Sequence, residues 1–355
     1  MRNIILVSPS SSLLKGDKHL ELLYRVLKKH GYHIYPFSFM KACRYNRRAI
    51  WHIHWIDMFH IGVIRRVRMR KQFAFISSLR FVNFLFLLIV CKLSGINILW
   101  TIHNVASHRN PGGFFERAVI RLLLNVADEV TALNENTKRA ICELYGFHEI
   151  DLMRQGLYER CYADTVTQEK ARKYLGLDEE AFVLLCLGRI EEYKGIDIAI
   201  EALEMTDDGV KLVVAGSLDR GSRYGAYVVR LAEKNKNVLL FDRFIPDDEM
   251  QFFFRAADYT IYPYRRIDNS GPLYLTLTFG IPTIMRGAGG VLETLKLNPG
   301  VAIVIDDLEI HTVAEAIKKA RTMRIASEEF VVYKETLNWA SLEQEIMQCF
   351  NKVQQ

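Results

Sequence analysis

A short segment flanked by glycines brings two cations to the start of a predicted helix. The apolar run at 182–187 predicts a buried strand, and the pattern over 196–203 predicts a helix. Between them the sequence reads Gly188-Arg189-Ile190-Glu191-Glu192-Tyr193-Lys194-Gly195. The N-terminus of a helix favours anions, Arg189 can hold phosphate oxygens with a planar fork, and Lys194 adds a point charge. The segment predicts binding of a phosphate-bearing ligand, with two surface cations on an ordinary turn as the alternative.

A second segment follows a strand predicted at 259–263. It reads Asp268-Asn269-Ser270-Gly271-Pro272-Leu273-Tyr274-Leu275, and it is followed by Phe279-Gly280-Ile281-Pro282. The pair Ser270-Gly271 is predicted to start a helix, where its N–H groups would help to hold a phosphate. Taken alone, the pair also fits a plain turn.

Together the two segments resemble the donor site of GT-B glycosyltransferases, in particular the large retaining family numbered four. The resemblance implies an α/β fold of two Rossmann-like, doubly wound domains that face each other across a cleft. It implies that Arg189 and Lys194 stabilise the diphosphate leaving group, whose negative charge grows as the glycosidic bond breaks. The further donor ligands that it implies are Gly188, Asp268, Asn269, Ser270, Gly271 and Leu275, with Phe244 and Ile245 packing on the nucleobase.

The chain departs from the family pattern at one donor position. Relatives carry two Glu residues, of which the second commonly binds the ribose of the donor. The corresponding positions here hold Ile267 and Leu275. The ribose contact is therefore either lost or transferred to a neighbour, and Asp268 is expected to stand in for the acid that contacts the sugar.

Two predicted strands of the first half end in polar residues that would lie on the acceptor side. Alternation along 51–56 sends His52 and His54 to the same face, His52 as a core residue and His54 toward the acceptor. His103 and Asn104 follow an apolar strand, where open α/β sheets bind ligands. His103 resembles the residue of the family that faces the donor sugar, and it is expected to act in catalysis. Asp57 is the candidate general base if the enzyme inverts configuration.

No cofactor or metal is expected. The sequence contains no Asp-x-Asp triplet, and no third ligand is spaced to join the His52 and His54 pair. Six cysteines are scattered without a Cys-x-x-Cys pair, which favours a reducing cytoplasm. The nucleotide sugar enters as a substrate.

Charge is distributed unevenly between the two halves. Residues 1–165 carry 24 Lys and Arg against 12 Asp and Glu, whereas the remainder carries 23 against 29. We expect the basic half to meet an anionic membrane surface rather than nucleic acid, because no nucleic-acid-binding motif is present. The predicted membrane-contact residues are Arg65, Arg66, Arg68, Arg70 and Lys71, with a solvated helix face as the alternative. The apolar run at 81–91 is too short to span a bilayer and is expected to be a buried crossover helix.

The domains are predicted as 1–165 for the acceptor, 166–335 for the nucleotide sugar, and a C-terminal helix at 336–355 that crosses back to the first domain, with a linker near 155–180. The predicted activity is metal-independent, retaining transfer of a hexose from a UDP- or GDP-sugar to a lipid-linked precursor of a capsule or exopolysaccharide. The protein is expected to be cytoplasmic and peripheral on the inner face of the membrane. The alternatives are an inverting transferase and a non-catalytic sugar-nucleotide-binding or scaffold protein on the same fold.

Overall fold

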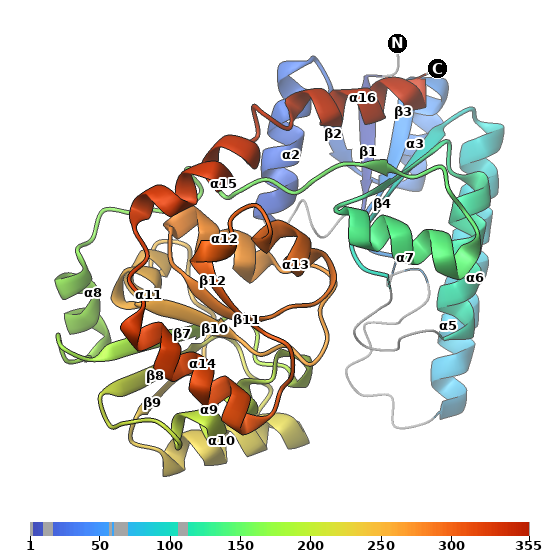
Figure 1. The fold of residues 1–355 in the computed structure, drawn as a ribbon. Coiled ribbons are helices and arrows are strands. Elements are labelled where there is room, and N and C mark those ends of the chain that lie inside the picture. Colours follow the sequence, from blue (N-terminus) through green and yellow to red (C-terminus); the bar gives the residue numbers. More distant parts are fainter. Residues whose placement is uncertain (1–2, 10–16, 57–58, 60–69, 106–112, 355) are drawn as a thin grey trace. The chain divides into compact units, whose positions relative to one another are not determined.

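The computed structural model describes residues 3–9, 17–56, 59, 70–105 and 113–354, with the backbone alone at 70–75 (Figure 1). The chain divides into two compact units. Unit 1 contains Met1–Gly156 and Trp339–Gln355, and unit 2 contains Leu157–Asn338.

Unit 1 is built on a parallel sheet, in which the described residues form six strands. The strand order is β2-β1-β3-β4-β5-β6, so the chain first moves to one side of β1 and then returns to its other side. The space between β1 and β3 at their carboxyl ends is therefore the switch point, where doubly wound sheets bind ligands. The strands are β1 (Ile4–Ser8), β2 (His33–Pro36), β3 (Ala49–Ile53), β4 (Asn97–Ile102), β5 (Glu129–Ala132) and β6 (Asp151–Leu152).

Helices connect and cover these strands. Several begin at a residue whose side chain accepts a hydrogen bond from the first turn, such as Asp17 before α2 and Asn134 before α7. The sheet and helices bury a core that includes Trp51, Phe84 and Trp100. The helices are α2 (Lys18–Lys29), α3 (Phe39–Tyr45), the 3-10 turn η1 (Asn46–Arg48), α5 (Arg70–Leu93), α6 (Phe114–Val126), α7 (Glu135–Tyr145) and α16 (Glu343–Gln354).

Unit 2 has a second parallel sheet of the doubly wound type, with the order β12-β11-β10-β7-β8-β9. Its switch point lies between β7 and β10. The strands are nearly continuous apolar runs because helices cover both faces of such a sheet. They are β7 (Phe182–Leu187), β8 (Val210–Ala215), β9 (Val238–Phe241), β10 (Tyr259–Tyr262), β11 (Thr283–Arg286) and β12 (Ala302–Ile305). The helices are α8 (Gln168–Leu175), η2 (Glu192–Lys194), α9 (Ile196–Leu203), α10 (Arg223–Lys234), α11 (Met250–Ala256), α12 (Gly271–Phe279), α13 (Gly289–Leu295), η3 (Pro299–Val301), α14 (Ile310–Thr322), η4 (Ser327–Phe330) and α15 (Val331–Thr336).

The α/β class with two doubly wound units is confirmed, but the expected linker is wrong in part. The division lies after Gly156 rather than after residue 165, and 168–175 forms helix α8, which packs against α11 in unit 2. At the other end of the chain, α16 packs across β4, β5 and β6 of unit 1. Its Glu345 forms an ion pair with Arg154 at 2.7 Å. The C-terminal helix therefore belongs to unit 1.

Helix α5 is not the buried crossover helix that the sequence predicts. It does connect β3 to β4, and Phe84, Leu88 and Cys91 lie in the core of unit 1. However, only 22% of the segment Ile76–Leu93 is buried. This segment has a mean hydropathy of 1.9 and, by length and composition, is the one helix in the described part of the chain that could cross a membrane.

Candidate active site

The predicted donor residues gather at the switch point of unit 2. Gly188 directly follows β7, and the segment 263–270 follows β10, the strand that pairs with β7. Lys194 ends the turn η2, and Ser270 precedes α12. The fold thus brings together the two segments that the sequence singles out.

Two glycines allow the backbone to pass unusually close to other atoms here. Gly188 has φ +119°, and a Cβ on it would lie 2.6 Å from Nζ of Lys194 and 3.6 Å from Pro272. Gly216 has φ +150°, and a Cβ there would lie 2.2 Å from the carbonyl oxygen of Gly188. A Cβ at Gly216 would overlap the backbone, and a Cβ at Gly188 would have to displace the end of the Lys194 side chain. The amine of Lys194 therefore rests directly against the Gly188 turn and close to the start of α12.

The Lys194 ammonium is buried without a direct ion-pair partner among the described residues, although the Glu191 carboxylate lies close enough to act on it. The residue is 6% exposed, and among the described residues its Nζ forms neither a hydrogen bond nor an ion pair. Burial lowers the pKa of this amine, because the charged form loses hydration. A buried cation without an ion-pair partner gains more from an anionic ligand than a cation in water does. Arg189 differs: its side chain is 59% exposed and lies 3.5 Å from Glu191 in an ion pair.

Arg265 fixes the turn that carries Lys194. Its backbone N–H donates to the carbonyl oxygen of Tyr193 at 2.8 Å, and its guanidinium donates to that of Glu192, also at 2.8 Å. The same guanidinium binds both oxygens of Asp197, at 2.8 and 2.5 Å. Burial would raise the pKa of Asp197, but the hydrogen bonds from Arg265 and Tyr224 outweigh it and lower the pKa.

Sequence reasoning missed Arg265 and Asp197. The signal for Arg265 was its position just past a predicted strand, two residues after Pro263. A cavity of about 820 Å³ adjoins the ion pair and is lined by Glu192, Tyr224 and Arg230, among others. It contains none of the predicted donor residues.

The start of α12 is held in place by buried hydrogen bonds. The Ser270 hydroxyl oxygen accepts from the backbone N–H of Leu273 at 3.2 Å and is 3.1 Å from the hydroxyl of Tyr264. The N–H of Gly271 lies in the first turn, where a helix offers no internal acceptor. This end of α12 is therefore positioned to donate to an anion beside Lys194.

The remaining donor residues surround this centre less closely. Asp268 and Asn269 are half-buried, and the Asp268 carbonyl oxygen accepts from the N–H of Gly290 at 2.8 Å. Leu275 is buried in α12 and offers no hydrogen-bonding group to a ribose. After β9, two strands from β7, Phe244 is 72% exposed and Ile245 is buried. Their packing on a nucleobase stays a prediction.

In unit 1, a chain of buried hydrogen bonds runs across the carboxyl ends of the strands and reaches His103. We name it the histidine chain. Its consecutive side-chain contacts measure 2.9, 2.8, 2.8, 2.7 and 2.9 Å. In order, its members are Thr131, Thr101, His52, Tyr24, His54 and His103.

The histidines in this chain are neutral. Burial lowers the pKa of His52 to about 3 and holds the pKa values of His54 and His103 well below the usual range. A neutral imidazole donates one hydrogen bond and accepts one, so the tautomer of His54 links its bond to Tyr24 with its bond to His103. His103 therefore presents its remaining ring nitrogen, Nδ1, as a neutral donor or acceptor and not as a charge.

His54 lies deeper than the sequence predicts. It is 1% exposed and contacts His103, whereas His103 is 8% exposed and stacks on Trp55 with ring centroids 4.4 Å apart. His19 packs edge-on against His103 at 5.7 Å. Among the described residues, neither ring nitrogen of His19 has a hydrogen-bond partner, and burial lowers its pKa to about 4.

Other predicted residues lie at the border of the described structure or beyond it. Asn104 is half-buried and directly follows His103. Asp57, Arg65, Arg66 and Arg68 lie outside the described residues, as do the side chains of Arg70 and Lys71. Within the described part of the chain, no group of three or more His, Cys, Asp or Glu residues is arranged to hold a metal ion.

Comparison with known proteins identifies the domain that carries the donor residues. Residues 167–336, nearly all of unit 2, match the family described as Glycosyl transferases group 1. A GDP-mannose:glycolipid 4-beta-D-mannosyltransferase of Xanthomonas campestris is 20% identical over 70% of this chain and 64% of its own length. A D-inositol 3-phosphate glycosyltransferase of Thermobispora bispora is 26% identical over 60% of this chain and 54% of its own length. The chain thus spans roughly half to two thirds of the length of these curated relatives.

The fold is also found among solved structures. The Anabaena protein HepE, solved in complex with UDP and glucose, superimposes with a TM-score of 0.70 at 16% identity. The superposition covers 99% of this chain and 100% of HepE. The chain therefore has the GT-B fold predicted from its sequence, and its residues 167–336 are similar to the family Glycosyl transferases group 1.

Proposed function

We propose that this protein transfers a hexosyl group from a UDP- or GDP-sugar to a glycan acceptor. The observation that carries the proposal is the buried Lys194 ammonium, which has no direct ion-pair partner among the described residues and lies against Gly188 beside the first turn of α12. A diphosphate supplies the missing negative charge, and the backbone N–H of Gly271 adds a donor. The similarity of residues 167–336 to this family supports the same chemistry.

In the proposed reaction, fixed cations do the work that a metal ion would otherwise do. As the bond between the sugar and the diphosphate breaks, negative charge grows on the leaving oxygens. The ammonium of Lys194 and the guanidinium of Arg189 stabilise this charge, and Arg265 with Asp197 keeps the Lys194 turn in place. Transfer is therefore proposed to be independent of metal ions and, by resemblance to the retaining family, to keep the configuration of the sugar.

On the acceptor side, the neutral His103 is proposed to bind a sugar hydroxyl, with Asn104 beside it. An uncharged hydroxyl suits a neutral imidazole better than a phosphate would. We propose a lipid-linked acceptor of a surface polysaccharide, since one relative is named for transfer to a glycolipid. A peripheral position on the inner face of the membrane, through residues 65–71, belongs to the same proposal.

The inverting alternative also has an observation in its favour. The Xanthomonas relative is named for a β-linked product from GDP-mannose, a donor whose sugar is α-linked. If this chain inverts, Asp57 is the proposed general base. The non-catalytic alternative would follow from Leu275, which cannot supply the ribose contact of the family.

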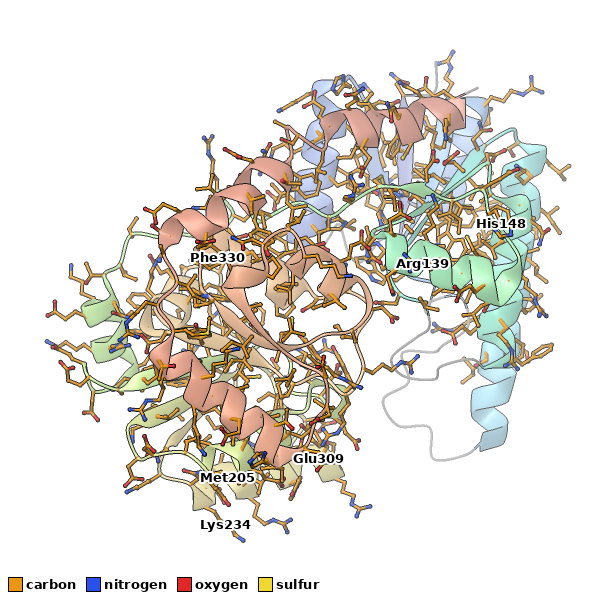
Figure 2. All side chains as sticks on the ribbon, in the orientation of Figure 1. Arg139, His148, Met205, Lys234, Glu309 and Phe330 are labelled. Atoms are coloured by element: carbon orange, nitrogen blue, oxygen red, sulfur yellow. The ribbon has the colours of Figure 1, made fainter. Side chains whose placement is uncertain are left out.

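The test measures the melting temperature with a panel of UDP- and GDP-sugars, followed by transfer with the sugar that stabilises the protein. Lys194→Ala should abolish the stabilisation by the donor and lower turnover about a hundredfold or more. Lys234→Ala is the matched control, because Lys234 is exposed at the end of α10 in the same unit (Figure 2). Donor binding by wild type without transfer would favour the scaffold alternative, and equal behaviour of the two variants would contradict the proposal.

A further inference from the structure

Helix α5 exposes a continuous apolar stripe on the side that faces away from the core of unit 1. Residues buried toward the core recur at positions 77, 84, 88 and 91. On the opposite side of the helix, a second set recurs every three or four residues and is 51–84% exposed. This stripe consists of Leu79, Val82, Phe86, Ile89 and Leu93. A helix on the surface of a globular protein normally carries polar residues there, so the stripe needs another explanation.

The apolar surface continues onto α3. Phe39 stacks on Phe86 with ring centroids 5.9 Å apart, and Phe39 is 46% exposed. Its neighbour Met40 is 80% exposed. Helices α3 and α5 are in contact, and Figure 1 shows α5 along the outside of unit 1 beside α6. We call the seven residues of the stripe and of α3 the apolar surface.

Basic residues are frequent in the part of the sequence that carries this surface. Between Ser38 and Leu93 the sequence contains eleven Lys and Arg residues and one acidic residue, Asp57. Arg44 and Arg48 are exposed at the end of α3 and in η1. None of the residues of the stripe is charged. An exposed apolar strip in a strongly basic segment matches the interface of an anionic bilayer, with acyl chains below the stripe and lipid phosphates beside the cations.

The same charge argues against the other occupants. A second copy of this chain would bring two strongly basic segments face to face, which costs free energy. A transmembrane position for α5 would pull Phe84, Leu88 and Cys91 out of the core of unit 1. The helix can instead lie in the plane of the interface and keep its packing on the sheet.

We propose that the apolar surface of α3 and α5 inserts into the interface of an anionic membrane and holds unit 1 there. The inference deepens the membrane part of the proposed function and rests on it. It adds an apolar contact that does not depend on residues 65–71. Binding should therefore have two components, an electrostatic one that salt weakens and an apolar one that resists salt.

The experiment is cosedimentation of the full chain with vesicles of phosphatidylcholine alone and of an equal mixture with phosphatidylglycerol. The stripe variant Leu79→Gln/Phe86→Gln/Ile89→Gln should lower the partition coefficient on the mixed vesicles on the order of a hundredfold, because three exposed apolar side chains no longer insert into the lipid. The matched control is Leu144→Gln/Met205→Gln/Val331→Gln, which removes three exposed apolar side chains elsewhere, among them Met205 (Figure 2). It should bind like wild type.

A second pair of variants tests the charge. Arg44→Gln/Arg48→Gln should weaken binding about fivefold for each cation at low salt and much less at high salt. Arg139→Gln, on α7, is the control and should change nothing (Figure 2). If wild type still binds the mixed vesicles at high salt and the stripe variant does not, the result supports insertion.

Three results would overturn the inference. Wild type could fail to bind the mixed vesicles, or the stripe variant could bind them as well as wild type. In the third case, sedimentation velocity would show that wild type forms a dimer and that the stripe variant does not. The apolar surface would then be an interface with a second copy of the chain. The change in melting temperature with the nucleotide sugar is measured for every variant without vesicles. An unchanged value shows that the donor site is intact, so failure here is distinct from failure of the proposed transfer.

Discussion

Replacing Gly188 by alanine tests whether the Lys194 amine must rest against the turn after β7. The new Cβ would lie 2.6 Å from Nζ, whereas ordinary contact begins near 3.4 Å. The amine must therefore move by roughly 0.8 Å, the difference between the two distances. A displacement near 1 Å in a catalytic arrangement costs on the order of a hundredfold in rate.

The substitution also strains the backbone, and this effect must be separated from the displacement of the amine. A φ of +119° is rare for any residue with a side chain and costs about 1–3 kcal/mol of the free energy of unfolding. Gly176→Ala is the matched control in the same unit. Its φ is +69°, which costs about 1–2 kcal/mol, and a Cβ there has no atom within 4 Å.

The assays are urea unfolding and steady-state transfer with the donor that stabilises wild type. Both variants should lose stability, but only Gly188→Ala should lose turnover and donor affinity. If Gly188→Ala transfers sugar as well as Gly176→Ala does, the amine does not act from its position against Gly188. The reasoning about the donor site would then be refuted.

Three further predictions concern Arg189, metal removal and acid stability. Arg189→Lys should recover only part of the turnover that Arg189→Ala loses, because an ammonium cannot form the planar fork, and kcat shows the difference. EDTA should leave transfer unchanged, and a strict requirement for Mn²⁺ or Mg²⁺ would contradict reliance on Arg189 and Lys194. The pKa of His19 is about 4 in the folded protein and near 6.5 in the unfolded chain. As the pH drops, the unfolded chain therefore binds the proton first. The free energy of unfolding falls between these two pH values, by up to about 3 kcal/mol. His19→Gln should flatten this dependence in urea unfolding at pH 7 and pH 5, and an unchanged slope would show that His19 is not responsible.

The donor segments could be predicted because their signals are local. A strand, a glycine turn with cations and a helix start follow one another in the sequence, and the parallel sheet then brings the turn after β7 beside the turn after β10. Arg265 was missed because its role depends on Asp197, which is 68 positions away in the chain. Sequence periodicity assigns a residue to a face but does not name its partner.

The histidine chain and the exposure of α5 show the same limit. Alternation placed His52 and His54 on one face, but the Tyr24 hydroxyl that joins them comes from α2, 28 positions before His52. In α5, apolar residues occur on all sides, which is typical of a buried helix. Only the packing of the sheet against a single side of the helix shows that the other side is exposed.

The two units use the same topological position for different chemistry. At the switch point of unit 2, glycines remove side chains, and a desolvated cation lies close to the N–H of Gly271 in the first turn of α12, an arrangement that suits a charged diphosphate. At the carboxyl ends of the strands in unit 1, aromatic rings and hydroxyls fill the space, and burial keeps the imidazoles neutral. Loss of the Tyr24 hydroxyl would leave one ring nitrogen of His52 and one of His54 without a hydrogen bond. Each unpaired nitrogen should lower the free energy of unfolding by about 1–3 kcal/mol. It would also break the hydrogen-bonded path that joins His103 and His54 to His52. Tyr24→Phe should therefore impair use of the acceptor while the donor still raises the melting temperature as in wild type, and equal losses on both sides would contradict this division of roles.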